Sequence, residues 1–166
     1  IEPGLAEGGN WIPSGNFIKG IRKICDKHGW LMIADEVLTG LGRTAEMWGM
    51  DHYKVIPDML IVGKNLSGGI APCAGVATRD EILGNNPSAS SGSTFAGTPA
   101  GCAAGLKTLE IYKRDKVIDH AKKLAQIAKL RMEPWCEKYS IVSETRQLGL
   151  LMGISFNLPD SLASSD

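Results

Sequence analysis

The sequence has no excess charge of either sign and no long apolar run. Its 166 residues include 18 acidic and 18 basic side chains, so the formal net charge is zero. A chain without a net field does not attract nucleic acid or an anionic membrane, and this balance favours a small-molecule partner. Apolar runs end within about ten residues, half the length that a membrane-spanning helix needs. We therefore expect a soluble, cytoplasmic protein.

The sequence also lacks the cysteine and histidine patterns of a metal or disulfide protein. Its four cysteines form no C-x-x-C pair, and its three histidines lie at no metal-ligand spacing from them. We expect reduced, mostly buried thiols and no metal site. The chain begins at Ile1 without an initiator methionine or the regions of a signal peptide. We expect it to be a piece of a longer protein.

The first half of the chain alternates between helix and strand patterns. Ser14 is placed to cap a helix with apolar residues at helical spacing, and Gly29 is placed to end it. The continuous apolar run 30–34 is typical of a strand covered on both faces, as in a parallel sheet. Residues 58–63 repeat this pattern, and residues 74–77 offer a shorter third strand. These patterns predict an α/β fold.

The second half begins with a polar stretch and continues with two long helices. Residues 82–97 are too polar and flexible for a core element and predict a loop. The pair 98–99 starts a helix with a capping hydroxyl and a proline, and its small residues 100–105 require another backbone to pack closely. A second helix follows Asp115 and ends near Pro134. It would connect two domains.

The tail of the chain predicts a hairpin. Residues 141–142 and 150–156 are apolar and read as two strands around a turn at Gly149. We expect these strands to begin a second domain.

Two charged residues follow the first two predicted strands, Asp35 and Lys64. The carboxyl edge of an open α/β sheet is where ligands bind, and the two residues are separated by about the length of one crossover unit. Burial of Lys64 would lower the pKa of its amine, which suits a Schiff-base nucleophile. Taken singly, Lys64 could equally reach out to water and Asp35 could cap the next turn. Together they favour a catalytic site.

Five blocks of sequence resemble the class III (omega) aminotransferases. Residues 33–44 resemble the family's D-E-V-x-T-G-x-G-R-T, and residues 57–64 resemble its P-D-I-x-x-x-x-K. Residues 91–99 resemble G-S-T-F-x-G-N-P. Residues 2–9 resemble E-P-x-x-x-E-x-G, and residues 146–150 resemble R-G-x-G-L. The blocks occur in family order and cover almost the whole chain, which chance does not produce.

This resemblance implies a fold and a domain division. The fold would be the three-layer α/β fold of fold type I enzymes that depend on pyridoxal phosphate. Residues 1–114 would form the second half of the large cofactor-binding domain. Residues 115–166 would supply a connector helix and the start of a small α+β C-terminal domain.

The resemblance also implies roles for five residues. Lys64 would form an imine with pyridoxal 5'-phosphate and later move the proton of the substrate carbon. Asp35 would pair with the pyridine nitrogen and keep it protonated, and Val37 would pack on one ring face. Ser93 and Thr94 would bind the cofactor phosphate. In the family this loop reaches the site of the other subunit, which implies a homodimer with shared active sites.

The implied reaction moves an amino group from an amine or omega-amino acid to a 2-oxo acid. Leu38 stands where many family members have a glutamine that binds the cofactor's phenolic oxygen, and apolar residues here resemble the omega-amino-acid:pyruvate branch and the glutamate-semialdehyde mutases. A racemase, an aminomutase or a decarboxylase would keep Asp35 and Lys64 unchanged. A non-catalytic fragment also stays open, because half of the cofactor site is outside this sequence. A nucleotide-binding domain is disfavoured, since both G-x-G-x-x-G and G-x-x-x-x-G-K-[ST] are missing.

Three further charged residues belong to these blocks. We expect Glu36 and Arg43 to be structural and to pair near the turn. Glu7 would lie near the substrate pocket, as its equivalents do in some family members.

Overall fold

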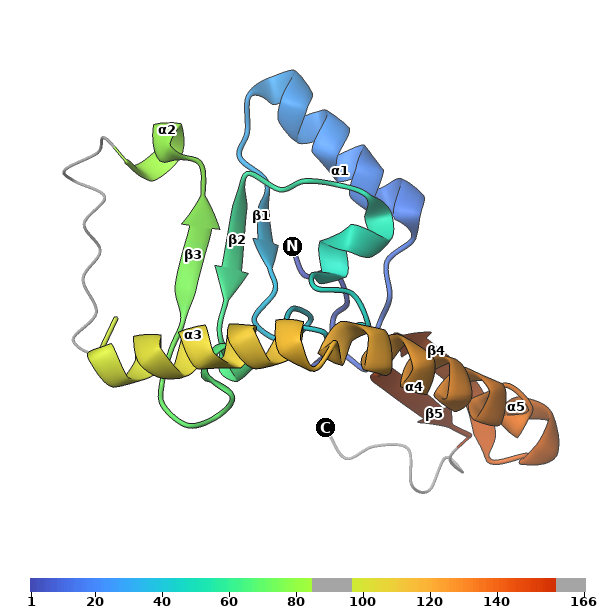
Figure 1. Ribbon diagram of the computed structural model, residues 1–166. Coiled ribbons are helices and arrows are strands. Elements are labelled where there is room, and N and C mark those ends of the chain that lie inside the picture. The colour runs from blue at the N-terminus through green and yellow to red at the C-terminus, as the bar shows by residue number, and fades with distance from the viewer. Residues whose placement is uncertain (85–96, 158–166) are drawn as a thin grey trace, which may run out of the picture.

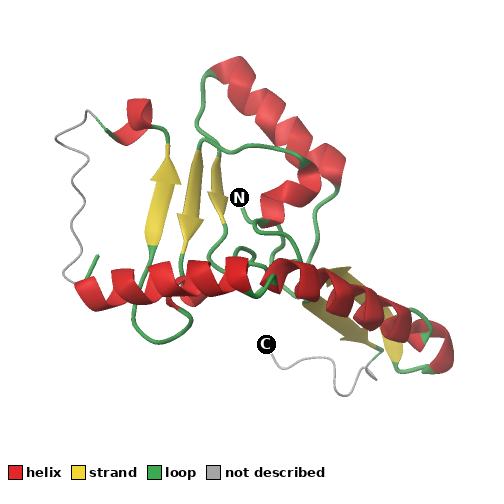
Figure 2. Cartoon of the chain, viewed as in Figure 1, coloured by secondary structure: helices red, strands yellow, loops and turns green. Residues whose placement is uncertain are grey.

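The chain forms a three-stranded sheet, a separate two-stranded hairpin and two long helices, as Figures 1 and 2 show. The computed structural model describes residues 1–84 and 97–157. The elements in chain order are α1 (Gly15–His28), β1 (Ile33–Asp35), η1 (Gly49–Tyr53), β2 (Met59–Val62), η2 (Lys64–Ser67), β3 (Gly75–Thr78), α2 (Asp80–Leu83), α3 (Pro99–Arg114), α4 (Val117–Met132), α5 (Trp135–Lys138), β4 (Val142–Leu148) and β5 (Leu151–Phe156).

The three-stranded sheet is mixed, with β2 between β1 and β3. β1 and β2 run parallel, so that Asp35 lies opposite Ile61. β2 and β3 run antiparallel, so that Val62 lies opposite Gly75. In Figure 1 the arrowheads of β1 and β2 point toward α3, whereas that of β3 points away from it. The parallel pair confirms the predicted α/β fold class and places two carboxyl ends beside α3.

Helix α1 has the boundaries that its sequence predicts. The Ser14 hydroxyl accepts a hydrogen bond from the Phe17 backbone N–H at 3.2 Å, and Gly29 ends the helix with a φ of +66°. These local caps satisfy backbone groups that a helix leaves free at its ends. The buried side of α1 packs against β1 and η1. The core cluster contains Ile18, Cys25, Met32, Ala34, Met50 and Tyr53.

Strand β1 is shorter than predicted, because it begins at Ile33 and not at Trp30. The Met32 backbone N–H donates to the Asp58 carboxylate at 2.8 Å, so this amide bonds a side chain and not a neighbouring strand. Trp30 is 60% exposed and its ring stacks on His28 at 5.0 Å. The described residues bury Ala34 and leave Ile33 exposed, so among them β1 is not covered on both faces as predicted.

Helix α3 begins as predicted and packs against another backbone. The Thr98 hydroxyl accepts a hydrogen bond from the Gly101 N–H at 3.3 Å. A β-carbon on Gly101 would lie 2.8 Å from the carbonyl oxygen of Pro72, which is closer than real β-carbons approach. The close packing predicted for residues 100–105 is therefore confirmed.

Helix α4 continues from α3 and carries the hairpin. It ends at Met132, two residues before Pro134, as predicted, and the short α5 follows. The Gln147 side-chain amide of β4 donates to the Ala125 carbonyl of α4 at 2.7 Å. In Figure 1 α4 lies alongside β4 and β5, which agrees with this bond.

The hairpin turn contacts the loop that follows β1. β4 and β5 pair antiparallel around Gly149, whose φ is +63°. A β-carbon on Gly149 would lie 1.9 Å from the carbonyl carbon of Thr44, so no other residue fits without a backbone shift. The Leu150 backbone N–H donates to the Arg43 carbonyl at 3.0 Å. The predicted hairpin is confirmed, and its turn is attached to the loop after Asp35.

Two predictions about the surface need correction. Helix α2 covers Asp80–Leu83, so the predicted loop 82–97 starts too early. The acidic residues in the first turn of α2 stabilise the helix, and the polar composition of the segment hid this short helix. Cys25 is buried, but Cys102 and Cys136 are exposed because they lie on outward faces of α3 and α5. None of the helices in the described ranges is long and apolar enough to cross a membrane.

Candidate active site

Asp35 presents a partly free carboxylate at the carboxyl end of β1. Its Oδ1 accepts a hydrogen bond from the Val37 backbone N–H at 3.0 Å, which fixes the orientation of the group. Among the described residues, no donor reaches Oδ2. The side chain is half-buried. One oxygen is therefore oriented by the protein, and the other is available to a ligand.

Lys64 follows the neighbouring strand at the same edge of the sheet. The parallel register places Asp35 beside Ile61, three residues before Lys64. Lys64 is the first residue of η2 and has a φ of +44°, in the left-handed region that residues with a β-carbon rarely adopt. Such backbone strain is concentrated at functional sites.

Lys64 is exposed, so of the two alternatives left open for it, burial and reaching out to water, the described residues show the second. η2 is a surface turn, and the described residues leave the outer side of the amine open. None of the ion pairs among the described residues includes Lys64.

Val37 lies beside the backbone that leads to Lys64. A β-carbon on Gly63 would lie 3.5 Å from Cγ1 of Val37 and 3.5 Å from Cβ of Ala74. Val37, Leu38 and Lys64 line one cavity of about 210 Å³. Small-molecule sites usually measure about 300–1,000 Å³, so this cavity alone is smaller than a complete site.

These residues fit the ring of pyridoxal phosphate. An oriented carboxylate oxygen suits a protonated pyridine nitrogen, an exposed amine suits an aldehyde, and a valine side chain suits a ring face. Asp35 does not line the cavity that Lys64 lines, although both lie at one sheet edge. Ser93 and Thr94, predicted to hold the phosphate, lie outside the described residues. No three His, Cys, Asp or Glu side chains in the described part of the chain are grouped to hold a metal ion.

Glu36 is a structural carboxylate that points away from this edge. It is only 1% exposed, and it accepts hydrogen bonds from the Thr39 hydroxyl at 2.5 Å and the backbone N–H groups of Gly49 and Met50 at 2.9 and 2.8 Å. Burial raises the pKa of Glu36, although these three bonds oppose the shift. The predicted pair of Glu36 with Arg43 is wrong, because the backbone of η1 takes this carboxylate.

Sequence reasoning missed two residues beside Lys64. The Asn65 side-chain amide donates to the Tyr112 hydroxyl at 2.6 Å, and that hydroxyl donates to the Leu41 carbonyl at 2.9 Å. Both residues line the cavity that contains Lys64. One signal was available, because Tyr112 falls at helical spacing from the small residues that predicted the packed face of α3.

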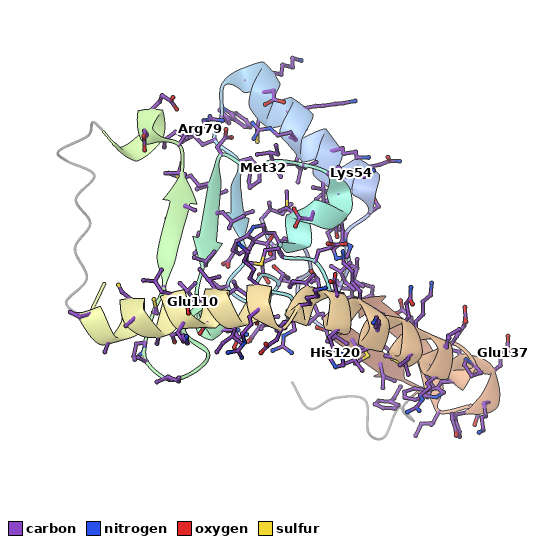
Figure 3. All side chains as sticks on the ribbon, viewed as in Figure 1. Met32, Lys54, Arg79, Glu110, His120 and Glu137 are labelled. Atoms are coloured by element: carbon purple, nitrogen blue, oxygen red, sulfur yellow. The ribbon has the colours of Figure 1, made fainter. Side chains whose placement is uncertain are left out.

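The opposite end of the sheet holds a charge network centred on Asp58. The Asp58 carboxylate accepts hydrogen bonds from Arg22 at 2.6 Å, Arg79 at 2.9 Å and the Met32 backbone at 2.8 Å. The Met32 N–H and the Arg22 guanidinium lower the pKa of Asp58. Figure 3 labels Met32 and Arg79 at the end of the sheet away from α3. This network joins α1, β1, β2 and β3.

Glu7 lies in an exposed turn that is docked on the hairpin. The turn is closed by a bridge between Leu5 and Trp11, and the Arg146 guanidinium lies 4.5 Å from the centroid of the Trp11 ring. The Asn10 side chain also donates to the Met152 carbonyl at 2.7 Å. Among the described residues no hydrogen bond joins Glu7 to Asp35 or Lys64, and a substrate role for Glu7 stays a prediction.

Comparisons with known proteins point to one family. The family model described as aminotransferase class-III matches residues 1–163. An aminotransferase from Archaeoglobus fulgidus is 40% identical over 146 residues, which are 86% of this chain and 34% of that protein. Acetylornithine aminotransferase from Elizabethkingia anophelis is 36% identical, with a TM-score of 0.88 over 95% of this chain and 41% of that one. Taurine:2-oxoglutarate aminotransferase from Bifidobacterium kashiwanohense, in complex with PLP and glutamate, is 32% identical, with a TM-score of 0.88 over 93% and 35% of the two chains.

The similarity covers nearly all of this chain but a minor part of each relative. The chain spans between 34% and 41% of the length of these three proteins. The superposition confirms the predicted fold, in which the chain corresponds to part of the large domain of a pyridoxal-phosphate-dependent aminotransferase.

Proposed function

The chain belongs to the class III aminotransferase family, and on this premise we propose that the protein transfers an amino group from an amine or omega-amino acid to a 2-oxo acid. Class III aminotransferases use pyridoxal phosphate, and one similar structure contains it. The observation that carries the proposal is that two residues lie at one sheet edge: Asp35, whose Oδ2 accepts no hydrogen bond from the described residues, and Lys64, which occupies a strained turn.

Each residue of the proposed site has a defined task. The bound cofactor supplies an electron sink for the charge that develops when a substrate carbon loses its proton. Lys64 is the Schiff-base lysine, and its Nζ then takes that proton and returns it at a different carbon. Oδ2 of Asp35 holds the proton of the pyridine nitrogen, while the Val37 N–H keeps Oδ1 in place. The Val37 side chain packs on the ring.

The names of similar proteins support the proposed substrate class. The two similar structures are described as acetylornithine and taurine:2-oxoglutarate aminotransferases. Acetylornithine and taurine both carry a primary amine at the end of a carbon chain, and 2-oxoglutarate is a 2-oxo acid. We carry the shared chemistry to this protein as a terminal amine donor and a 2-oxo acid acceptor.

The assembly belongs to the same proposal. Ser93 and Thr94 of one subunit would bind the phosphate of the cofactor whose aldehyde reacts with Lys64 of the other, so we propose a homodimer with shared sites. Residues 1–114 belong to the second half of the large domain, and residues 115–166 form a connector helix and the start of the small C-terminal domain. We place the enzyme in the cytoplasm.

One observation favours a second candidate function. Leu38 lines the cavity beside Lys64, where its side chain can donate no hydrogen bond to the phenolic oxygen of the cofactor. An apolar residue at this position resembles the glutamate-semialdehyde mutases as well as the omega-amino-acid:pyruvate branch. An aminomutase would use Asp35 and Lys64 in the same way but would consume no 2-oxo acid.

Borohydride reduction of the full-length protein tests the proposal. Reduction should fix the cofactor on the peptide that contains Lys64, as mass spectrometry would show. Lys64→Ala should abolish the visible absorbance and lower turnover by at least about 10²-fold. Lys54→Ala is the matched control, because Lys54 is also exposed and also left-handed, with a φ of +54°. Normal turnover of Lys64→Ala would refute the proposal, and turnover without any 2-oxo acid would favour the aminomutase.

A further inference from the structure

We propose that Tyr112 is a positioning residue that joins the loop after Asp35 to the turn that carries Lys64. Its hydroxyl accepts a hydrogen bond from the Asn65 side chain at 2.6 Å and donates one to the Leu41 carbonyl at 2.9 Å. A tyrosine hydroxyl has one hydrogen to donate and lone pairs to accept, so both bonds form together. The inference rests on the proposed function of Asp35 and Lys64.

Tyr112 is the last residue on the face of α3 that packs against η2. Gly105, Thr108 and Tyr112 are spaced three and four residues apart and therefore share one side of the helix. A β-carbon on Gly105 would lie 3.5 Å from the Leu66 carbonyl oxygen, and one on Gly68 would lie 3.0 Å from Oγ1 of Thr108. The turn thus rests on a rigid helix, and Tyr112 adds the polar contact at the end of this face.

The Tyr112 ring also packs against the loop after β1. A β-carbon on Gly42 would lie 3.5 Å from Cε1 of Tyr112 and 2.8 Å from Cδ1 of Ile118. The loop is therefore held to α3 by the ring as well as by the bond from the hydroxyl to Leu41.

Both segments that Tyr112 binds contain strained backbone. Lys64, which precedes Asn65, has a φ of +44°, and Leu41 has a φ of +54°. Neither conformation is favoured by a residue with a β-carbon, so each requires support from its surroundings. A side chain anchored on a long helix supplies that support to both at once.

These contacts support a role for Tyr112 in positioning the two segments and not in proton transfer. The hydroxyl hydrogen of Tyr112 is donated to Leu41, which leaves none for a substrate. Tyr112 and Lys64 line the same cavity, and Tyr112 accepts a hydrogen bond from Asn65, which directly follows Lys64, so loss of that bond would loosen the turn that carries the amine. Displacements of about 1 Å lower catalytic rates by as much as 10²-fold, so small changes are measurable.

The test compares three variants of the full-length enzyme with a matched control. Tyr112→Phe removes both hydrogen bonds and keeps the ring, Asn65→Ala removes one bond, and a third variant combines them. Tyr139→Phe is the control, because Tyr139 is exposed and meets Lys138 through its ring face. The measurements are the dissociation constant of pyridoxal phosphate, the pH at which the visible band of the bound cofactor titrates, and kcat and KM for the amino donor.

We expect Tyr112→Phe to weaken cofactor binding and lower kcat, each by roughly tenfold, with the donor KM within about twofold. The visible band should titrate at a different pH. Asn65→Ala should give a smaller change in the same direction. The combined variant should match Tyr112→Phe, because Asn65 acts only through Tyr112.

Two outcomes would overturn the inference. In the first, Tyr112→Phe equals Tyr139→Phe in cofactor binding, band titration and kcat, whatever its melting temperature, and Tyr112 is then structural only. In the second, the effect of the combined variant equals the sum of the effects of Asn65→Ala and Tyr112→Phe, and the two residues then act separately. Failure of the proposed function is a separate result, because it would appear as normal turnover or retained visible absorbance in Lys64→Ala.

Discussion

Two aspartates at opposite ends of the same sheet differ in how many hydrogen bonds their carboxylates accept. Asp58 precedes β2 and accepts hydrogen bonds from Arg22, Arg79 and the Met32 backbone. Asp35 ends β1, and among the described residues only the Val37 N–H donates to it. The carboxylate whose oxygens are filled by its own chain stabilises the fold. The one that keeps an oxygen free is available to a ligand.

Glu36 is a third carboxylate that separates burial from function. It is the most buried of the three, yet its two oxygens accept bonds from Thr39, Gly49 and Met50. It follows Asp35 directly and faces the other way, so neighbouring acidic residues serve different ends. Burial alone is therefore no sign of a ligand-binding carboxylate here, and our proposal for Asp35 rests on the oxygen that the described residues leave free.

The largest effect that we predict is on catalysis by Asp35→Asn in the full-length protein. The amide cannot hold the proton on the pyridine nitrogen, so kcat should fall by about 10²-fold or more while the cofactor still binds. Steady-state kinetics at saturating cofactor would measure this. Weaker binding with an unchanged kcat would show that Asp35 is only an anchor.

The matched change at the other end, Asp58→Asn, should damage stability and not catalysis. Loss of the charged acceptor weakens the bonds from Arg22, Arg79 and the Met32 backbone, which should cost about 2 kcal/mol of unfolding free energy. Denaturant unfolding would measure the loss. Asp26→Ala is the control, because Asp26 pairs with Arg22 on the surface and should cost under about 1 kcal/mol. A large fall in kcat for Asp58→Asn at full cofactor saturation would break the comparison.

The pH dependence of stability should separate Asp58 from Glu36 by sign. Because the folded-state pKa of Asp58 is lowered, its stabilisation is present above the ordinary value of 3.8 and is lost as the pH falls through the folded pKa. Because the folded-state pKa of Glu36 is raised, stability is lost as the pH rises from the ordinary value of 4.5 through the folded pKa. The unfolding free energy should be measured between pH 3 and 7. Its fall toward low pH should be weaker in Asp58→Asn, and its fall as the pH rises above 4.5 should be weaker in Glu36→Gln. Equal slopes in both variants would contradict the assignment.

The smallest predicted effect concerns the two left-handed lysines. Lys54→Gly and Lys64→Gly should each raise the unfolding free energy by about 0.5–1 kcal/mol, because glycine adopts a positive φ without strain. Thermal melts of the apoprotein would measure both gains, and activity should be lost only in Lys64→Gly. A stability loss at either position would show that the lysine side chain contributes contacts that outweigh the strain.

Features set by neighbouring residues were predictable from the sequence. Ser14 and Gly29 mark the ends of α1 through their own backbone and side-chain chemistry, and the strand patterns placed Asp35 and Lys64 at one edge. The start of β1 was not predictable, because the bond that draws Met32 out of the ladder comes from Asp58, 26 residues away. The Tyr112 bonds span 47 and 71 residues, and no local pattern reports such distances.

The left-handed turn at Lys64 gives this position a use in judging related sequences. If folding were the only requirement, glycine or asparagine would suit a φ of +44° better than lysine. If the proposed function is absent in a related protein, glycine or asparagine can replace Lys64 there without loss of stability. A related sequence with glycine or asparagine here and the other site residues intact is best interpreted as a folded protein that has given up the chemistry.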